Sequence, residues 1–202
     1  MDIVGNSTEI INHIFQIYDV NQIGISFNGG KDNTVMLNLI NSCVNVCNVK
    51  CFYFRTSNNQ FDEIEEFILK SREKYNLDLI TYNGTIKDCL YKIKQEYPDI
   101  KIIFMGTRQT DLSRKLEFIE STTSGWPEFT LINPIKDWKY SDVWNYLISG
   151  NIDYCDLYNK GYTSIGDKNN TMPNINLLKD GIYLHASELH DDSLERINRI
   201  KN

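Results

Sequence analysis

Residues 26–32 near the start of the chain have the residue types and spacing of a phosphate-binding turn. The glycine pair Gly29 and Gly30 stands between an apolar run that predicts a buried strand and residues 34–40, which predict a helix. Glycine lets the backbone approach a ligand closely, and a helix start offers unpaired N–H groups and about half a positive charge. The segment therefore predicts an anion site, although two adjacent glycines can also form a simple turn.

A second segment that could do chemistry begins at Gly106, where another apolar run ends. Its arginine, Arg108, has the fork of donors that clamps a phosphate, and Asp111 could hold Mg²⁺ or a hydroxyl group. An arginine and an aspartate three residues apart can equally form a surface ion pair. The segment alone does not decide between a phosphate site and a surface ion pair, and other motifs of the chain are needed to decide.

The elements that must position these residues alternate between strands and helices. The predicted strands cover residues 23–27, 49–54, 77–82, 101–105 and 129–132, and the predicted helices cover 7–18, 34–43, 61–75, 87–97, 141–149 and a tail at 191–201. This order predicts an α/β fold, a Rossmann-like parallel sheet with helices on both faces, followed by a loop-rich C-terminal extension. Ligands of such sheets bind beyond the carboxyl ends of the strands, where both candidate segments begin.

Composition limits the function classes. The 202 residues carry a net charge of −6, which argues against a general nucleic-acid binder. We find no apolar run of the ~20 residues that a membrane span needs, and no secretory signal. The five cysteines include no C-x-x-C pair and indicate reduced thiols. We therefore expect a cytoplasmic protein with no membrane and no nucleic-acid partner. The sequence gives no signal for the oligomeric state, and a monomer is the working expectation.

The glycine turn differs from a Walker A loop, because Ile25 and Asp32 occupy the places of its first glycine and its Ser/Thr. It resembles instead the PP-loop of ATP pyrophosphatases, commonly written S-G-G-x-D, with Asn28 in the place of the serine. Enzymes of that superfamily cleave ATP between the α and β phosphates. The resemblance therefore favours chemistry at the α-phosphorus.

Further motifs make the resemblance specific. A Trp-Pro-Glu-Phe run begins at Trp126, followed by G-Y-T-S-I-G at 161–166, N-T-M-P-N at 170–174 and E-R-I-N-R at 195–199. Together with the two earlier segments, this set resembles the eukaryotic-type FAD synthetases (FMN adenylyltransferases), which are part of the PAPS reductase-like branch of the PP-loop superfamily. The match runs in order from about Phe15 to Arg199, which is nearly the whole chain.

The resemblance implies that the chain transfers AMP from ATP to FMN with Mg²⁺, giving FAD and pyrophosphate. It implies a single domain over 1–202, with a nucleotide-binding core at 1–135 and a flavin-site extension at 136–202. Implied catalytic residues are Asn28, Asp32, Arg108 and Asp111, of which Asp32 and Asp111 would be metal ligands. Implied ATP contacts are Ser26, Phe27, Asn28, Gly29, Gly30, Lys31, Asp32, Phe54, Arg55, Gly106 and Arg108. Implied FMN contacts are Asp111, Thr123, Trp126, Tyr162, Arg196 and Arg199.

The chain also departs from the family pattern. Asn33 and Leu112 stand where the family usually has Cys and Pro, and Thr123 replaces an acid three residues before the tryptophan. The contacts to the flavin ring are therefore the least specified part of the resemblance. The alternatives are a PAPS reductase-like enzyme, another PP-loop adenylating enzyme, or a nucleotide-binding module without catalysis. The reductases need a cysteine near the end, and no cysteine follows Cys155.

Overall fold

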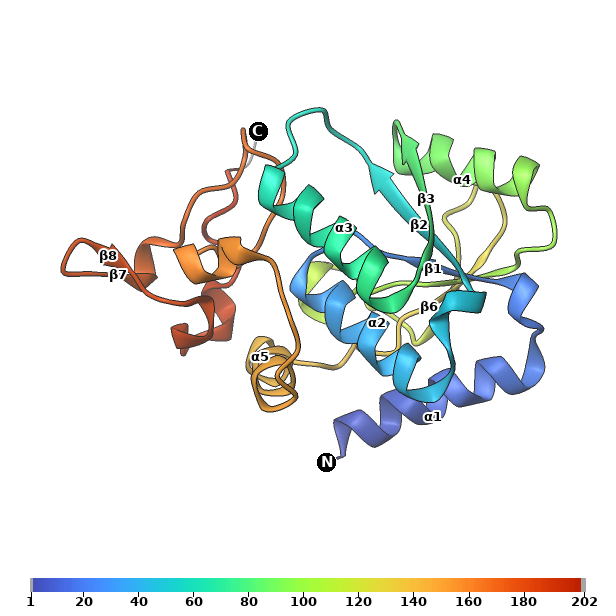
Figure 1. The fold of residues 1–202 in the computed structure, drawn as a ribbon, viewed down its shortest axis with the longest axis horizontal. Coiled ribbons are helices and arrows are strands. Elements are labelled where there is room, and N and C mark those ends of the chain that lie inside the picture. Colours follow the sequence, from blue (N-terminus) through green and yellow to red (C-terminus); the bar gives the residue numbers. More distant parts are fainter. Residues whose placement is uncertain (1, 201–202) are drawn as a thin grey trace.

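A six-stranded sheet with the order β3-β2-β1-β4-β6-β5 lies at the centre of the protein (Figure 1), and the computed structural model describes residues 2–200. Its strands are β1 (Ile23–Ser26), β2 (Lys50–Arg55), β3 (Asp78–Asn83), β4 (Ile102–Phe104), β5 (Ile119–Ser121) and β6 (Thr130–Ile132). The pairs β1–β2, β2–β3, β1–β4 and β4–β6 are parallel, and β5 pairs antiparallel with β6. The predicted α/β fold with a largely parallel sheet is confirmed.

Helices cover both faces of this sheet (Figure 1). They are α1 (Ile3–Ile17), α2 (Lys31–Cys43), α3 (Asp62–Tyr75), α4 (Ile86–Glu96) and α5 (Tyr140–Ser149). Because side chains alternate along a strand, Tyr53 joins the core that contains residues of α1, α2 and α3, while its neighbour Phe52 joins a second core with Cys89 and Ile93 of α4. None of the helices within residues 2–200 combines the length and apolar character needed to span a membrane.

Strand β5 was not predicted, because its three residues include a glutamate and are partly exposed. A strand this short carries too little alternation to be recognised from sequence. It forms the edge of the sheet and is held there by pairing with β6, from Ile119 opposite Ile132 to Ser121 opposite Thr130.

The predicted tail helix at 191–201 is wrong for the residues that the structure describes, and residue 201 lies outside them. Only a 3-10 turn, Asp192–Leu194, forms there. The N–H of Met172 donates to the carbonyl of Asn198, and the N–H of Ile200 donates to the carbonyl of Asn170. These long-range bonds take the backbone groups that a helix would have used internally. The tail is therefore an irregular strap of turns that is held against residues 170–172.

The remainder of the C-terminal part is also irregular. It contains a two-stranded hairpin, β7 (Leu178–Lys179) with β8 (Ile182–Tyr183), and short 3-10 helices at Asp156–Lys160, Ile175–Leu177 and Ala186–Glu188. Helix α5 connects this part to α2, one of the helices that cover the sheet. The hydroxyl of Tyr146 in α5 donates to the side-chain oxygen of Asn38 in α2 at 2.8 Å. The division of the chain at residue 135 into a core and a flavin-site extension stays a prediction.

Candidate active site

A cleft of about 450 Å³ opens at the carboxyl ends of β1, β2 and β4. The chain passes from β1 to β2 and β3 on one side and returns to β4 on the other, so this edge is the switch point of the sheet. The predicted site residues that line it are Ser26, Asn28, Gly30, Lys31, Asp32, Phe54, Gly106, Asp111, Arg196 and Arg199. The cleft is also lined by residues to which the sequence analysis assigned no site role, among them Gln60, Tyr158, Ser164, Asp167, Asn170 and Glu195.

The glycine turn is held in one conformation by the side chains of Asn28 and Thr34, which flank it. Gly29 has a φ of 73°, a left-handed conformation that favours glycine, and a Cβ there would lie 2.9 Å from Ile68. The Asn28 side-chain oxygen accepts from the N–H of Gly30 at 3.0 Å. The hydroxyl of Thr34 donates to the Gly30 carbonyl at 2.9 Å. Asn28 therefore shapes the turn from within, whatever contact it makes with a ligand.

Two cations and two carboxylates meet behind the turn, and we call Lys31, Asp32, Arg108 and Glu195 the buried ion cluster. The Nζ of Lys31 lies 3.0 Å from Asp32 Oδ2 and 2.5 Å from Glu195 Oε1. Arg108 donates through Nη2 to both carboxylate oxygens of Glu195, at 2.5 and 2.6 Å. The Nε of Arg108 lies 2.7 Å from Asp32 Oδ1. The cluster joins the glycine turn, the loop after β4 and the C-terminal strap.

Burial decides what each member of this cluster can contact. The Arg108 side chain is 0% exposed, so it lies behind the cleft wall and its charge reaches the cleft through Asp32. Lys31 is also buried, and its ammonium lies 5.2 Å from the centre of the Tyr140 ring. Asp32 is the member with an appreciably exposed side chain, at 19%.

Two members of the cluster, Asp32 and Arg108, are charged at neutral pH. Burial raises the pKa of Asp32, but the charges of Lys31 and Arg108 outweigh burial and leave that pKa below its usual value. Burial works against the charged form of Arg108, and Asp32 and Glu195 outweigh it, so the pKa of Arg108 is raised. The cleft therefore has an ionised carboxylate, Asp32, supported from behind by two cations.

A second carboxylate–arginine pair lies at the mouth of the cleft. Asp111 accepts from the backbone N–H of Arg108 at 2.9 Å through Oδ2, and from Arg196 Nη1 at 2.7 Å through Oδ1. The Arg196 side chain is 47% exposed. Unlike Arg108, this guanidinium faces water and can reach a ligand.

The other tail arginine, Arg199, occupies a half-buried place beside the G-Y-T-S-I-G segment. Its Nη1 donates to the hydroxyl of Ser164 at 3.4 Å. A Cβ at Gly166 would lie 2.3 Å from Arg199 Nη2, so glycine leaves room for the guanidinium. Burial lowers the pKa of Arg199, and the charge of Arg196 lowers it further. The two arginines thus share the cleft although no helix presents them.

Several predicted contacts lie away from the cleft wall. Phe27 is fully buried in the first core, and Arg55 forms an ion pair with Glu65 of α3. The ring of Tyr162 packs edge-on against Phe61 at 5.4 Å. Contacts to ATP through the backbone of Phe27 or Arg55 remain predictions.

The predicted flavin residues Thr123 and Trp126 lie in the turn between β5 and β6. The strand register places that turn at the opposite end of the sheet from Gly106, and neither residue is part of the cleft wall found within residues 2–200. Trp126 packs against the second core, on the α4 face of the sheet.

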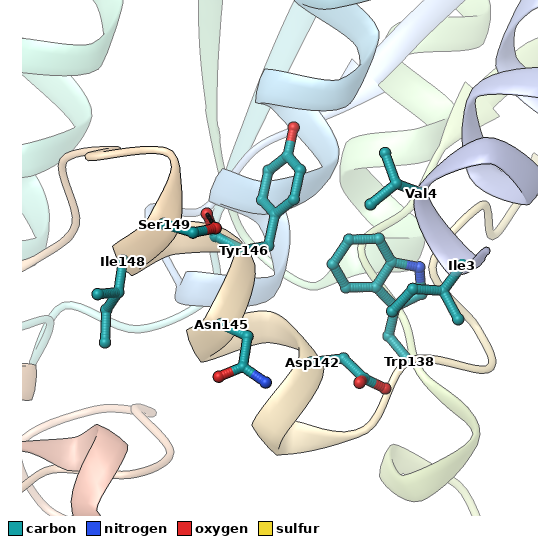
Figure 2. A pocket seen from close by; sticks show the side chains of 8 residues that line it. All are labelled: Ile3, Val4, Trp138, Asp142, Asn145, Tyr146, Ile148 and Ser149. Atoms are coloured by element: carbon teal, nitrogen blue, oxygen red, sulfur yellow. Dashed lines mark hydrogen bonds between the residues drawn. The ribbon is translucent and has the colours of Figure 1, made fainter. Parts of the chain in front are cut away.

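A separate depression of about 540 Å³ lies between α1 and α5, and Figure 2 shows Trp138 between Ile3 of α1 and Tyr146 of α5. Two of its polar groups already have partners within the protein. Trp138 Nε1 donates to Ser7, and Asp142 accepts from the N–H of Lys139, both at 2.9 Å. The motif residues are in the other cleft, which is therefore the candidate site.

The fold and this cleft define an α/β protein with a glycine turn at the switch point of its sheet, the class in which nucleotides bind at that edge. The sequence profile described as the phosphoadenosine phosphosulfate reductase domain matches residues 22–88 and 85–173. A probable FAD synthase of Schizosaccharomyces pombe is 35% identical over 208 residues, covering 96% of this chain and 77% of that protein. The chain belongs to the phosphoadenosine phosphosulfate reductase domain family and, within it, to the FAD synthase family.

Two further comparisons agree with this family. A probable FAD synthase of Caenorhabditis elegans is 36% identical over an alignment of 208 residues that covers 97% of this chain and 40% of that protein, so the chain spans about two fifths of that relative's length. The crystal structure of Candida glabrata FMN adenylyltransferase in complex with FMN and the ATP analog AMPCPP has a TM-score of 0.90 at 26% identity. That match covers 98% of this chain and 88% of that chain.

Proposed function

We propose that the chain is an FMN adenylyltransferase, which transfers AMP from ATP to FMN and releases pyrophosphate. The observation that carries the proposal is the convergence of the glycine turn, Asp32 and the two tail arginines on one cleft at the switch point of the sheet. Such a cleft offers amide donors and cations to two anionic substrates. The names of the similar proteins support the same reaction.

The reaction asks for alignment more than for covalent catalysis. An oxygen of the FMN phosphate must attack the α-phosphorus of ATP in line, while pyrophosphate leaves. Both partners are anions, so the site must hold them end to end and offset their charge. The glycine turn between Asn28 and Gly30 is the natural seat of the ATP phosphates, with Phe54 beside it for the adenine.

Arg196 and Arg199 are the residues that suit the FMN phosphate. The positive charge of Arg196 disfavours the charged form of Arg199. An anion bound between the two guanidinium groups would offset this repulsion. Bidentate donation suits a terminal phosphate group. The proposed attack therefore takes place between the tail strap and the glycine turn.

The α4 face of the sheet offers a path for the flavin ring. Met105 lines the cleft, and Met105, Leu131 and Trp126 all pack against the second core. A contact between the ring and Trp126 stays a prediction, since Trp126 lies outside the cleft wall. Contacts to Thr123 and Tyr162 stay predictions.

Magnesium fits this cleft as a substrate-bound ion. No cluster of three or more His, Cys, Asp or Glu residues suited to a metal occurs within residues 2–200, and Mg²⁺ is commonly held by one or two carboxylates together with substrate phosphates. Asp32 and Asp111 both line the cleft, and their carboxylates are the proposed protein ligands. When bound, the ion would offset charge on the triphosphate.

A PAPS reductase-like thiol reaction is less well supported. None of the five cysteines, all within the described residues, lines the cleft. Cys155 is buried, and burial raises the pKa of its thiol to about 11, which disfavours the reactive thiolate. All five are free thiols, which supports the proposed cytoplasmic location.

The test is to incubate the protein with FMN, ATP and Mg²⁺ and to measure FAD and pyrophosphate by chromatography. We expect both products in equal amounts, and neither when FMN is omitted. A parallel incubation with PAPS and a thiol reductant should release no sulfite. Nucleotide binding without FAD would favour a non-catalytic module, and sulfite release would favour the reductase.

A further inference from the structure

A tyrosine hydroxyl lies at the start of α2, where the sequence predicts free amide groups. The backbone N–H of Lys31 donates to the hydroxyl oxygen of Tyr158 at 2.8 Å. A Cβ at Gly30 would lie 3.9 Å from the same oxygen, so the hydroxyl stands beside the glycine turn. Tyr158 is 1% exposed and lines the cleft. The first amide of the helix is therefore covered by a side chain from the C-terminal part.

This hydroxyl retains a proton that it can donate. A phenol has one O–H donor and can accept as well, and here the accepting side takes the Lys31 N–H. Within residues 2–200 the O–H of Tyr158 has no acceptor. Burial raises the pKa of Tyr158, and the nearby negative charge of Asp32 raises it further, so the group is protonated at neutral pH.

The ring that carries the hydroxyl is held rigidly. Tyr158 packs edge-on against Trp144 with the ring centres 5.2 Å apart, and Tyr154 packs edge-on against the same tryptophan at the same separation. Trp144 is itself buried and belongs to α5. A donor fixed in this way loses little freedom when it binds an anion.

We propose that Tyr158 is a phosphate-binding residue, whose O–H donates to a phosphate oxygen of the nucleotide seated at the glycine turn. The N–H of Lys31 orients the hydroxyl by donating to its oxygen. The O–H of Tyr158 then donates to the ligand in place of the Lys31 amide. The proposal rests on the proposed function for the identity of the nucleotide. It does not depend on transfer to FMN.

The experiment compares Tyr158→Phe with Tyr154→Phe. Both changes delete one hydroxyl from a ring that packs on Trp144, but Tyr154 lines a different depression, beside Lys74 and Asp153. The dissociation constants of ATP, inorganic triphosphate and adenosine are measured by calorimetry without FMN. We expect Tyr158→Phe to weaken ATP and triphosphate at least about tenfold and to leave adenosine unchanged, because one hydrogen bond to a charged group is lost. Tyr154→Phe should bind all three like the wild type.

Unchanged ATP affinity in Tyr158→Phe would overturn the proposal. Equal losses in the two variants, or a loss that includes adenosine, would also overturn it, because the effect would then come from the aromatic packing. Thermal unfolding of both variants checks that the fold is intact. Failure of the proposed function is seen separately, as a wild-type protein that binds ATP and forms no FAD.

Discussion

The back and the mouth of the cleft contain the same kind of contact in opposite environments. The Nε of Arg108 lies 2.7 Å from Asp32 Oδ1 at the back, and Arg196 Nη1 lies 2.7 Å from Asp111 Oδ1 at the mouth. The two arginine side chains are 0% and 47% exposed. Distance alone therefore does not separate a structural pair from one that a ligand can open, whereas exposure does.

The difference follows from solvation. A charge at the mouth that loses its partner regains water, and exposed pairs contribute about 0–1 kcal/mol. A charge at the back has no such replacement, and removing one partner of a buried pair costs about 3–5 kcal/mol. We conclude that the back of the cleft is a permanent part of the fold, whereas the exposed pair at the mouth can open at little cost.

The largest expected effect is a loss of turnover on substitution of Asp32, the member of the buried ion cluster that is partly exposed to the cleft. Asp32→Ala should lower the rate of FAD formation at least about a hundredfold, since it removes the carboxylate that faces the phosphates. The fold should persist, because Glu195 still pairs with both Lys31 and Arg108. The measurement is kcat together with a thermal melt, and near-normal kcat would remove Asp32 from the mechanism.

The contribution of Asp32 to the free energy of unfolding should also depend on pH. Its folded-state pKa is lowered, so its contribution to stability is complete above the usual carboxylate range and is lost as the pH falls through the lowered pKa. The gap in unfolding free energy between wild type and Asp32→Asn should stay constant from neutral pH down to about pH 4 and close only below it.

The next largest effect concerns stability. Glu195→Gln should lower the free energy of unfolding by about 3 kcal/mol, because Lys31 and Arg108 lose a shared buried anion. The matched control is Glu117→Gln, which removes a carboxylate 2.7 Å from Lys115 on the exposed surface. That control should cost under about 1 kcal/mol. Equal losses in urea unfolding would contradict the distinction between the two regions.

The smallest effect on the fold is expected at the mouth. Arg196→Ala should change the unfolding free energy by about 0.5 kcal/mol or less, and should raise the KM for FMN more than the KM for ATP. Arg114→Ala is the control, because it breaks an exposed pair with Glu120 that does not line the cleft. Equal changes in both KM values would separate Arg196 from the FMN phosphate.

The sheet and the glycine turn could be predicted because their signals are local. Apolar runs, turn residues and helical spacing all lie within a few positions of one another, and those elements agree with the structure to within a few residues at their ends. The turn at Gly29 and the loop from Gly106 could be assigned to one edge because parallel strands share an end. Asn28, Asp32 and Asp111 accordingly meet in one cleft.

What could not be predicted depends on contacts between distant positions. The strap replaces the expected helix because the side-chain amide of Asn198 donates to the carbonyls of Ser164 and Met172. Arg108 has the residue type of a phosphate clamp. Behind the cleft wall, however, its Nη2 donates to Glu195 and its Nε lies next to Asp32. Only the E-R-x-x-R and G-Y-T-S-I-G motifs, through their resemblance to a family, pointed to this part of the site.

The reach of Glu195 has a consequence for the order of assembly. Lys31 and Arg108 are both synthesised well before Glu195, the acid that bridges them, which follows Lys31 by 164 positions. Until the ribosome has added it, Asp32 alone must neutralise two cations within a growing hydrophobic interior. Contacts of such high separation form late. The nascent chain can therefore build its sheet before it has a complete cleft, because the buried ion cluster behind that cleft is finished only when Glu195 has been added.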